Sequence, residues 1–234
     1  MTLSQIHVVS GDNISEINRD LWQFIPKHGN HIKFGDKNRI KWATESVILM
    51  QMYKNALIQL YNGETPDGWM FKGNSQQIYL NMLKDPDPGE QDYTYGQRLH
   101  DQNAENQIEN VREALREAIE NEIQSNRIAG NIWTPEDIRL KDPPCFAFFQ
   151  LRTSEKNKVS LRVVFRSHDY GNGNFANFGA IIKCFIDEVI EPAGGQLEEL
   201  LCLSWSGHIY DTDMDMVTSY LFGKAPSFIR RLLK

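Results

Sequence analysis

The sequence has few of the features that mark secreted, metal-binding or membrane proteins. Only three of its 234 residues are cysteine, and Cys145, Cys184 and Cys202 are widely spaced with no C-x-x-C pair. This pattern encodes neither a disulfide framework nor a zinc site, and no other metal site is predicted. The longest uncharged apolar run, residues 175–182, is far shorter than the ~20 residues that a membrane-spanning helix needs. Residues 1–11 lack the basic start and apolar stretch of a signal peptide, so we expect a cytoplasmic protein without membrane contact.

Positive charge is also scarce. The chain has 25 Lys and Arg against 31 Asp and Glu, which gives a formal net charge of −6. A nucleic-acid polymer is therefore excluded as the main partner, because binding its backbone needs a basic face. A local basic pocket for one small phosphate remains compatible with this charge. With 41% hydrophobic residues and this length, we expect one globular domain over 1–234.

Apolar periodicity predicts an α+β fold, with a mixed or antiparallel sheet flanked by helices. Apolar residues recur at helical spacing over 12–24, 106–124 and 175–189, and a last helix is expected to begin near Asp211. Alternating residues predict strands over 145–151, 159–165 and 200–210, with Cys145 on the same face as Phe149 and Leu151. Residues 27–39 are predicted to form a loop, 63–73 and 85–91 form turns, and 40–61 has no clean period.

Polar residues gather where the predicted elements end, which is where an α+β fold commonly places its site. These residues are Tyr95-Gly96, Cys145, Arg166-Ser167-His168-Asp169 with Asn177, and His208-Ile209-Tyr210. His168, Cys184 and Cys202 are interpreted as structural core residues.

In this order and spacing the clusters resemble thymidylate synthases and their relatives, the pyrimidine nucleotide hydroxymethylases. The family's Pro-Cys nucleophile strand corresponds to Pro144-Cys145, and its R-S-x-D signature to residues 166–169. A glycine loop with Gly173, a helix with Asn177 and the H-x-Y strand end at 208–210 follow. The runs YTYGQRL, FRSHD and FAN look most similar to the short thymidylate synthase-like proteins of methanogenic archaea. The resemblance is specific over 93–210 and weak over 1–92.

The resemblance implies one-carbon transfer to C5 of a pyrimidine nucleoside monophosphate, from methylene-tetrahydrofolate or methylene-tetrahydromethanopterin. A thiolate that adds to C6 makes C5 nucleophilic, and by resemblance this nucleophile is Cys145. Arg166 would lower the pKa of the thiol and bind the nucleotide phosphate with Ser167, since a guanidinium is a forked phosphate donor.

The remaining residues of the motif would hold the two substrates. The Asn177 amide has one donor and one acceptor, which match O4 and N3–H of uracil, whereas the cytosine-specific relatives have Asp there. By resemblance, Gly173 belongs to the substrate loop, and His208 and Tyr210 hold the sugar hydroxyl. Asp169 would meet the pterin, and Tyr95 would order the polar network around the base.

The family is a two-fold dimer whose sheets pack face to face, and each site borrows arginines from its partner. The borrowed Ser-Arg-Arg corresponds here to Ser125-Asn126-Arg127, so we expect Arg127 to act across a homodimer interface.

Three positions depart from the family pattern and keep alternatives open. Spacing places the family's N-terminal glutamate near Gln76-Gln77, with Glu45 and Glu64 as the nearest carboxylates. Phe146 follows the nucleophile in place of histidine, and the chain ends in the basic run 229–234. Thymidylate formation is therefore the first hypothesis. The alternatives are a nucleotide 5-hydroxymethylase with the same nucleophile, and a nucleotide-binding relative without catalysis.

Overall fold

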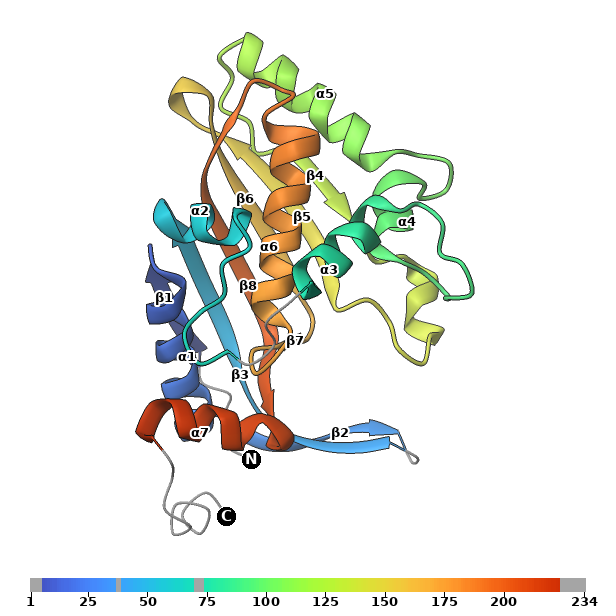
Figure 1. Cartoon of the computed structure of the whole chain (residues 1–234). Coiled ribbons are helices and arrows are strands. Elements are labelled where there is room, and N and C mark those ends of the chain that lie inside the picture. The colour runs from blue at the N-terminus through green and yellow to red at the C-terminus, as the bar shows by residue number, and fades with distance from the viewer. Residues whose placement is uncertain (1–5, 37–38, 70–73, 224–234) are drawn as a thin grey trace.

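The computed structural model describes residues 6–36, 39–69 and 74–223. The described residues form a mixed eight-stranded sheet with the order β1-β3-β8-β6-β5-β4, in which β2 pairs with β3 and β7 with β8 (Figure 1). The strands are β1 Ile6–Gly11, β2 Asn30–Asp36, β3 Arg39–Tyr53, β4 Ile128–Asn131, β5 Phe146–Thr153, β6 Lys158–Phe165, β7 His168–Asp169 and β8 Gln196–Tyr210.

Helices lie between these strands in the sequence, and the predicted α+β class is confirmed. They are α1 Ile14–His28, α2 Asn55–Tyr61, α3 Ser75–Lys84, α4 Tyr95–His100, α5 Gln107–Glu120, α6 Asn174–Phe185 and α7 Met214–Phe222. A π-turn, Ile186–Ile190, extends α6, and a 3₁₀ turn, Asp211–Asp213, precedes α7, so the last helix begins slightly later than predicted.

One face of the sheet carries the hydrophobic core. A row of paired residues crosses six strands, and every member is buried: Val9, Met50, Cys202, Val163, Phe149 and Gly130. Helix α6 packs on this face and is in turn covered by α2 and α3 (Figure 1). Because it is enclosed on both sides, α6 is apolar around most of its circumference, as the sequence predicts. Cys184 and Cys202 are both fully buried, which confirms their place in the core.

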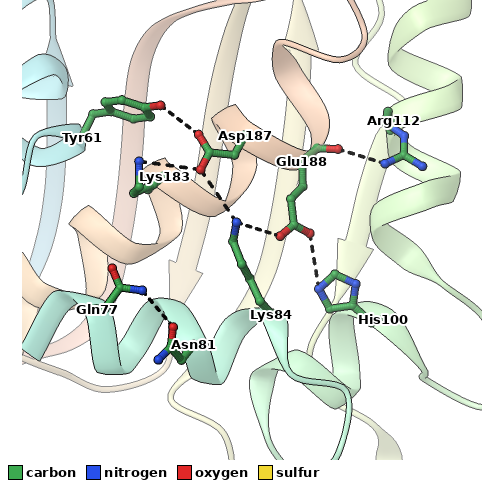
Figure 2. A network of polar contacts seen from close by, with 9 residues as sticks. All are labelled: Tyr61, Gln77, Asn81, Lys84, His100, Arg112, Lys183, Asp187 and Glu188. Carbon is green, nitrogen blue, oxygen red and sulfur yellow. Dashed lines mark hydrogen bonds and ion pairs between the residues drawn. The ribbon is translucent and has the colours of Figure 1, made fainter.

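Charged side chains at the C-terminal end of α6 tie the covering helices together (Figure 2). Lys84 of α3 lies 3.1 Å from Glu188 and 3.8 Å from Asp187 of the π-turn. The Tyr61 hydroxyl of α2 donates to Asp187, and His100 of α4 lies 3.6 Å from Glu188. This network fixes α2, α3 and α4 relative to α6, and therefore relative to the first turn of α6, where Asn177 lies.

Two local predictions are wrong. Residues 30–36 form β2 of a hairpin with β3, not a loop, because the pairing to β3 satisfies their backbone while charged side chains such as Lys33 stay exposed. At the start of β5 the pairing with β6 shifts register between Phe146 and Phe148. Phe146 is therefore buried on the core side with Phe149, and Cys145 lies just before the strand instead of alternating within it.

The opposite face of the sheet carries no helix of the described chain. A second row of directly paired residues crosses five strands there: Val8, Leu49, Leu203, Val164 and Phe148. Val8 is 64% exposed, and Trp205 near the same face is 60% exposed. We call the row, with Trp205, the open sheet face.

Candidate functional site

Cys145 lies in the short connection that leads into β5, and two neighbouring segments hold this connection. The Trp133 indole donates to the Pro144 carbonyl at 2.7 Å, and the Arg166 backbone N–H donates to the Cys145 carbonyl at 2.9 Å. These two hydrogen bonds fix the backbone on both sides of Cys145. The Cys145 side chain is half-buried.

The Arg166 side chain folds back over the same connection from the end of β6. Its Nε donates to the Pro144 carbonyl at 2.9 Å, and Nη2 donates to the Pro143 carbonyl at 2.6 Å. Nη2 also lies 3.8 Å from the exposed carboxylate of Asp142. Two of the five guanidinium N–H groups are thus used for positioning, and the others remain available for an anion.

The charge on Arg166 does not by itself make Cys145 acidic. Burial raises the pKa of the Cys145 thiol and outweighs the lowering by Arg166, while Asp142 and Asp169 raise it further. Arg166 therefore lowers the thiol pKa as expected, but the net direction is upward because burial is the larger effect.

Tyr95 joins this cluster from α4, which Thr94 caps by accepting from the Gln97 N–H at 3.0 Å. The Tyr95 hydroxyl accepts a hydrogen bond from the backbone N–H of Phe146 at 3.2 Å. Its ring meets the Phe146 ring edge to face at 5.9 Å. Tyr95 therefore anchors the residue that follows Cys145.

Asp169 lies at the end of β7, and its carboxylate shapes the turn toward α6. Its Oδ1 accepts from the backbone N–H groups of Gly171 at 2.9 Å and Asn172 at 3.2 Å. Burial, followed by the nearby Asp213 carboxylate, raises the pKa of Asp169 to about 6. This carboxyl group therefore exchanges a proton near neutral pH.

His208 and Tyr210 end β8 beside this turn. Their rings lie 4.7 Å apart, and burial lowers the pKa of His208 to about 4. His208 is thus neutral at physiological pH, with Nδ1 3.1 Å from the Ser206 carbonyl. Burial and the charges of Asp169 and Cys145 raise the pKa of Tyr210, which places its hydroxyl in the same neighbourhood.

The predicted loop and helix residues lie around this group. Asn177 is half-buried in the first turn of α6, with Nδ2 3.6 Å from the point where a Cβ on Gly173 would lie. A side chain at 173 would thus lie against the Asn177 amide. Ser167 follows Arg166 directly and is half-buried. His168 is buried and stacks on Phe165 at 3.9 Å, in agreement with a structural role.

Arg127 is the one predicted residue that lies far from the others. It precedes β4, where Ile128 pairs with Leu151 of β5, six residues beyond Cys145. At about 3.3 Å per residue this places Arg127 roughly 20 Å along the strand from the thiol. The exposed Arg127 side chain therefore cannot reach the cluster of its own chain.

The sequence did not identify four residues that lie near the site: Tyr79, Tyr93, Lys41 and Asp213. The pKa values of Tyr79, Tyr93 and Tyr95 are raised first by burial and also by Cys145, so these phenols surround the thiol. All three line a cavity of about 450 Å³ together with Met82 and Asp142. Tyr93 belongs to the YTYGQRL run, whereas Tyr79 lies on α3, a helix that the turn-rich sequence around it did not indicate.

Of the residues considered in place of the family's glutamate, Gln76 and Gln77 bond within the helical layer, and Glu45 lies opposite His208 in the sheet. The Gln76 amide packs against Gly179 and donates to the Leu60 carbonyl at 2.8 Å, and Gln77 donates to Asn81. Glu45 accepts a short hydrogen bond from Ser206. Residues 229–234, the basic end of the chain, lie outside the described residues.

Two further observations bear on the class of site. No helix among the described residues is long and apolar enough to cross a membrane. Within the same part of the chain, no group of three or more His, Cys, Asp and Glu side chains is arranged to hold a metal ion.

The chain is similar in sequence to several known proteins. A protein of Methanosarcina acetivorans is 29% identical over 223 residues, which cover 92% of this chain and 95% of that protein. Proteins of Methanosarcina mazei and Methanosarcina barkeri are 36% and 32% identical over 56% of this chain, and each match spans 59% of the relative's length. All three carry the name "Putative thymidylate synthase". The family model described as thymidylate synthase matches residues 4–229, and the chain therefore belongs to the thymidylate synthase family.

Proposed function

We propose that the protein transfers a one-carbon unit to C5 of a uridine-type nucleotide, with dUMP as substrate and dTMP as product. The observation that carries this proposal is the Arg166 guanidinium, which two proline carbonyls hold beside the half-buried Cys145 thiol. A nucleophile and a phosphate-binding cation fixed on one connection suit a small phosphorylated substrate better than a polymer.

In this mechanism the Cys145 sulfur forms a bond to C6 of the base, and C5 becomes the nucleophile that takes the one-carbon unit. Loss of the C5 proton, transfer to that unit of a hydride, which the methylene-tetrahydropterin would supply, and cleavage of the S–C6 bond would then give dTMP and restore the thiolate. Burial raises the pKa of the Cys145 thiol and the Arg166 charge lowers it, so the thiolate that adds to C6 is expected to be a minor species that Arg166 stabilises. His208, neutral at physiological pH, and Tyr210 would hold the sugar hydroxyl.

The base is selected by Asn177, whose amide matches uracil and mismatches cytosine. Asn177→Asp is expected to shift binding toward cytidine nucleotides, which isothermal titration with uridine and cytidine monophosphates measures. Tighter binding of cytidine nucleotides to the unmodified protein would show that Asn177 has been misread.

The donor is a methylene-tetrahydropterin, either the folate or the methanopterin form. The fit to this group is supported by the cavity that Tyr79, Tyr93 and Tyr95 line, because their rings offer flat faces, and by the charge of Asp169, which acts on both Tyr79 and Cys145. When bound, the donor supplies the carbon. Asp169 would position it and hold a proton facing it.

The reaction is tested by incubating the protein with dUMP and each methylene donor and measuring the mass of the nucleotide product. Thymidylate is expected, Cys145→Ala is expected to abolish its formation, and Cys184→Ala, which changes a fully buried thiol, is the matched control. Full activity of Cys145→Ala would refute the nucleophile.

A hydroxymethyl product would establish the second candidate function, in which water instead of hydride completes the reaction. The Gln76 and Gln77 side chains, which spacing places at the family's glutamate, are amides that bond to Leu60 and Asn81, and this favours keeping that candidate. Binding of dUMP without turnover would instead support the relative that only binds nucleotide.

We further propose that the active unit is a two-fold dimer in which the open sheet face packs against its copy. The apolar row on this face is long, continuous and exposed at Val8, which suits an isologous interface. The distance of Arg127 from its own Cys145 fits a role in the partner's phosphate site.

Mixed dimers test this arrangement. Arg127→Ala and Cys145→Ala subunits are each expected to be inactive alone. Mixing them should restore about a quarter of the activity, because half of the dimers would contain one complete site. No recovery after verified subunit exchange would contradict a shared site, and Trp205→Glu should shift the protein toward the monomer in light scattering.

A further inference from the structure

Asp213 occupies a position where it has no evident structural task. It is the residue before α7, where an aspartate commonly accepts hydrogen bonds from the first turn, yet its side chain makes no such bond. The carboxylate is directed instead at the turn after β7. Its Oδ2 lies 3.1 Å from the point where a Cβ on Gly171 would be, and Asp169 Oδ1 lies 3.3 Å from the same point. The two carboxyl groups therefore flank Gly171.

Lys41 of β3 brings a positive charge to the two carboxyl groups of Asp169 and Asp213. Its Nζ lies 4.7 Å from the centre of the Tyr210 ring, and its charge lowers the pKa values of both Asp169 and Asp213. The titratable or charged groups around Asp169 are Asp213, Lys41, Tyr79, Tyr210, Cys145 and its strand partner His208.

We propose that Asp213 is a positioning residue for Asp169: its carboxylate, which lies with that of Asp169 against Gly171, presents a negative charge to the Asp169 carboxyl group beside the reacting thiol. This inference rests on the proposed function and adds the proton carrier that the site otherwise lacks. Among the described residues, the carboxylates that act on Cys145 are Asp142 and Asp169. Asp142 is 97% exposed and faces Arg166, which leaves Asp169 as the buried acid.

The arrangement has a direct chemical consequence. A protonated Asp169 can give its proton to the donor nitrogen from which the one-carbon unit departs. Asp169 then takes up a new proton from solvent. The two backbone N–H groups on Oδ1 hold the carboxyl group in place during both steps. The neighbouring Asp213 carboxylate raises the proton affinity of Asp169, and this effect needs no further residue in the site.

Direct titration of the Asp169 carboxyl carbon by NMR, with labelled aspartate, tests the proposal without relying on turnover. Asp213→Asn removes a negative charge, so the midpoint is expected to fall below about 6. Each unit of fall reduces the protonated fraction at pH 7 about tenfold. Lys41→Met removes a positive charge and is expected to move the midpoint upward. Asp211→Asn is the matched control, because Asp211 lies in the same turn but pairs with His31 at 3.1 Å.

The kinetic counterpart is the pH dependence of product formation. The alkaline limb of kcat should move to lower pH in Asp213→Asn and stay in place in Asp211→Asn, with the KM for dUMP unchanged. An unmoved Asp169 midpoint in Asp213→Asn would overturn the inference even if thymidylate is formed. If no product forms with any variant, the proposed function fails, and the NMR midpoints still decide whether Asp213 tunes Asp169.

Discussion

The hydrogen bond from the Phe146 N–H to the Tyr95 hydroxyl offers a sharp test of how the nucleophile is held. Tyr95→Phe deletes only the acceptor oxygen and leaves the ring, which packs edge to face on Phe146. Phe146 is fully buried, so water does not replace the lost acceptor without some opening of the connection at Cys145.

The expected loss follows from the cost of a buried backbone N–H without a partner. That cost is about 1–3 kcal/mol in the free energy of unfolding. For a chain of this size it corresponds to a fall in Tm of roughly 2–10 °C. If the connection opens instead, Cys145 becomes more exposed, the burial that raises its pKa is relieved, and its alkylation becomes faster.

Urea unfolding and the rate of iodoacetamide labelling at pH 7.5 measure these two outcomes. Tyr93→Phe is the matched control, since the Tyr93 hydroxyl has no hydrogen bond within the described part of the chain, and its ring lies 6.2 Å from that of Tyr95. Stability and labelling rates in Tyr95→Phe that match those of Tyr93→Phe would refute the argument that this hydroxyl anchors the nucleophile.

Three further changes have calculable outcomes. Arg166→Gln removes the positive charge beside Cys145, so the thiol pKa should rise further and alkylation should require higher pH; an unchanged pH profile would contradict the pairing. Arg98 lies 2.7 Å from Asp137, and Asp137→Ala leaves it as a partly buried unpaired cation, which should cost about 3–5 kcal/mol in unfolding free energy. Asp142 is exposed, and Asp142→Ala should cost under about 0.5 kcal/mol. Burial lowers the folded-state pKa of His168 to about 3, below its unfolded value, so this residue contributes stability above pH 6.5 that is lost on acidification. The difference in unfolding free energy between the protein and His168→Gln should therefore shrink by about 1.4 kcal/mol per pH unit from pH 6.5 to 4, and a constant difference would show that His168 is not buried in its neutral form.

The sequence predicted those elements whose periodicity is strong and whose environment is uniform. Strand β6 alternates regularly because one face is in the core, and α6 is apolar around most of its surface because it is enclosed between the sheet and two helices. Strand β2 was missed because the side chains at 30–33 are exposed or half-buried, and hydrophobic periodicity records burial alone. The sequence also did not predict the register shift at Phe146. One extra residue in a strand moves the following side chains to the other face of the sheet, and the amino-acid composition does not reveal it.

The types of residue in the site and their order along the chain were determined by the sequence alone: a thiol after two prolines, an arginine 21 positions later, and an amide, an imidazole and a phenol beyond it. Tertiary structure decided what the sequence has no means to encode locally, namely burial and distance between remote residues. Burial makes the Cys145 thiol less acidic than its neighbour Arg166 suggests, and the approach of Asp213 from another element raises the proton affinity of Asp169. Both effects arise from desolvation and from charge across space, so they exist only once the chain has folded.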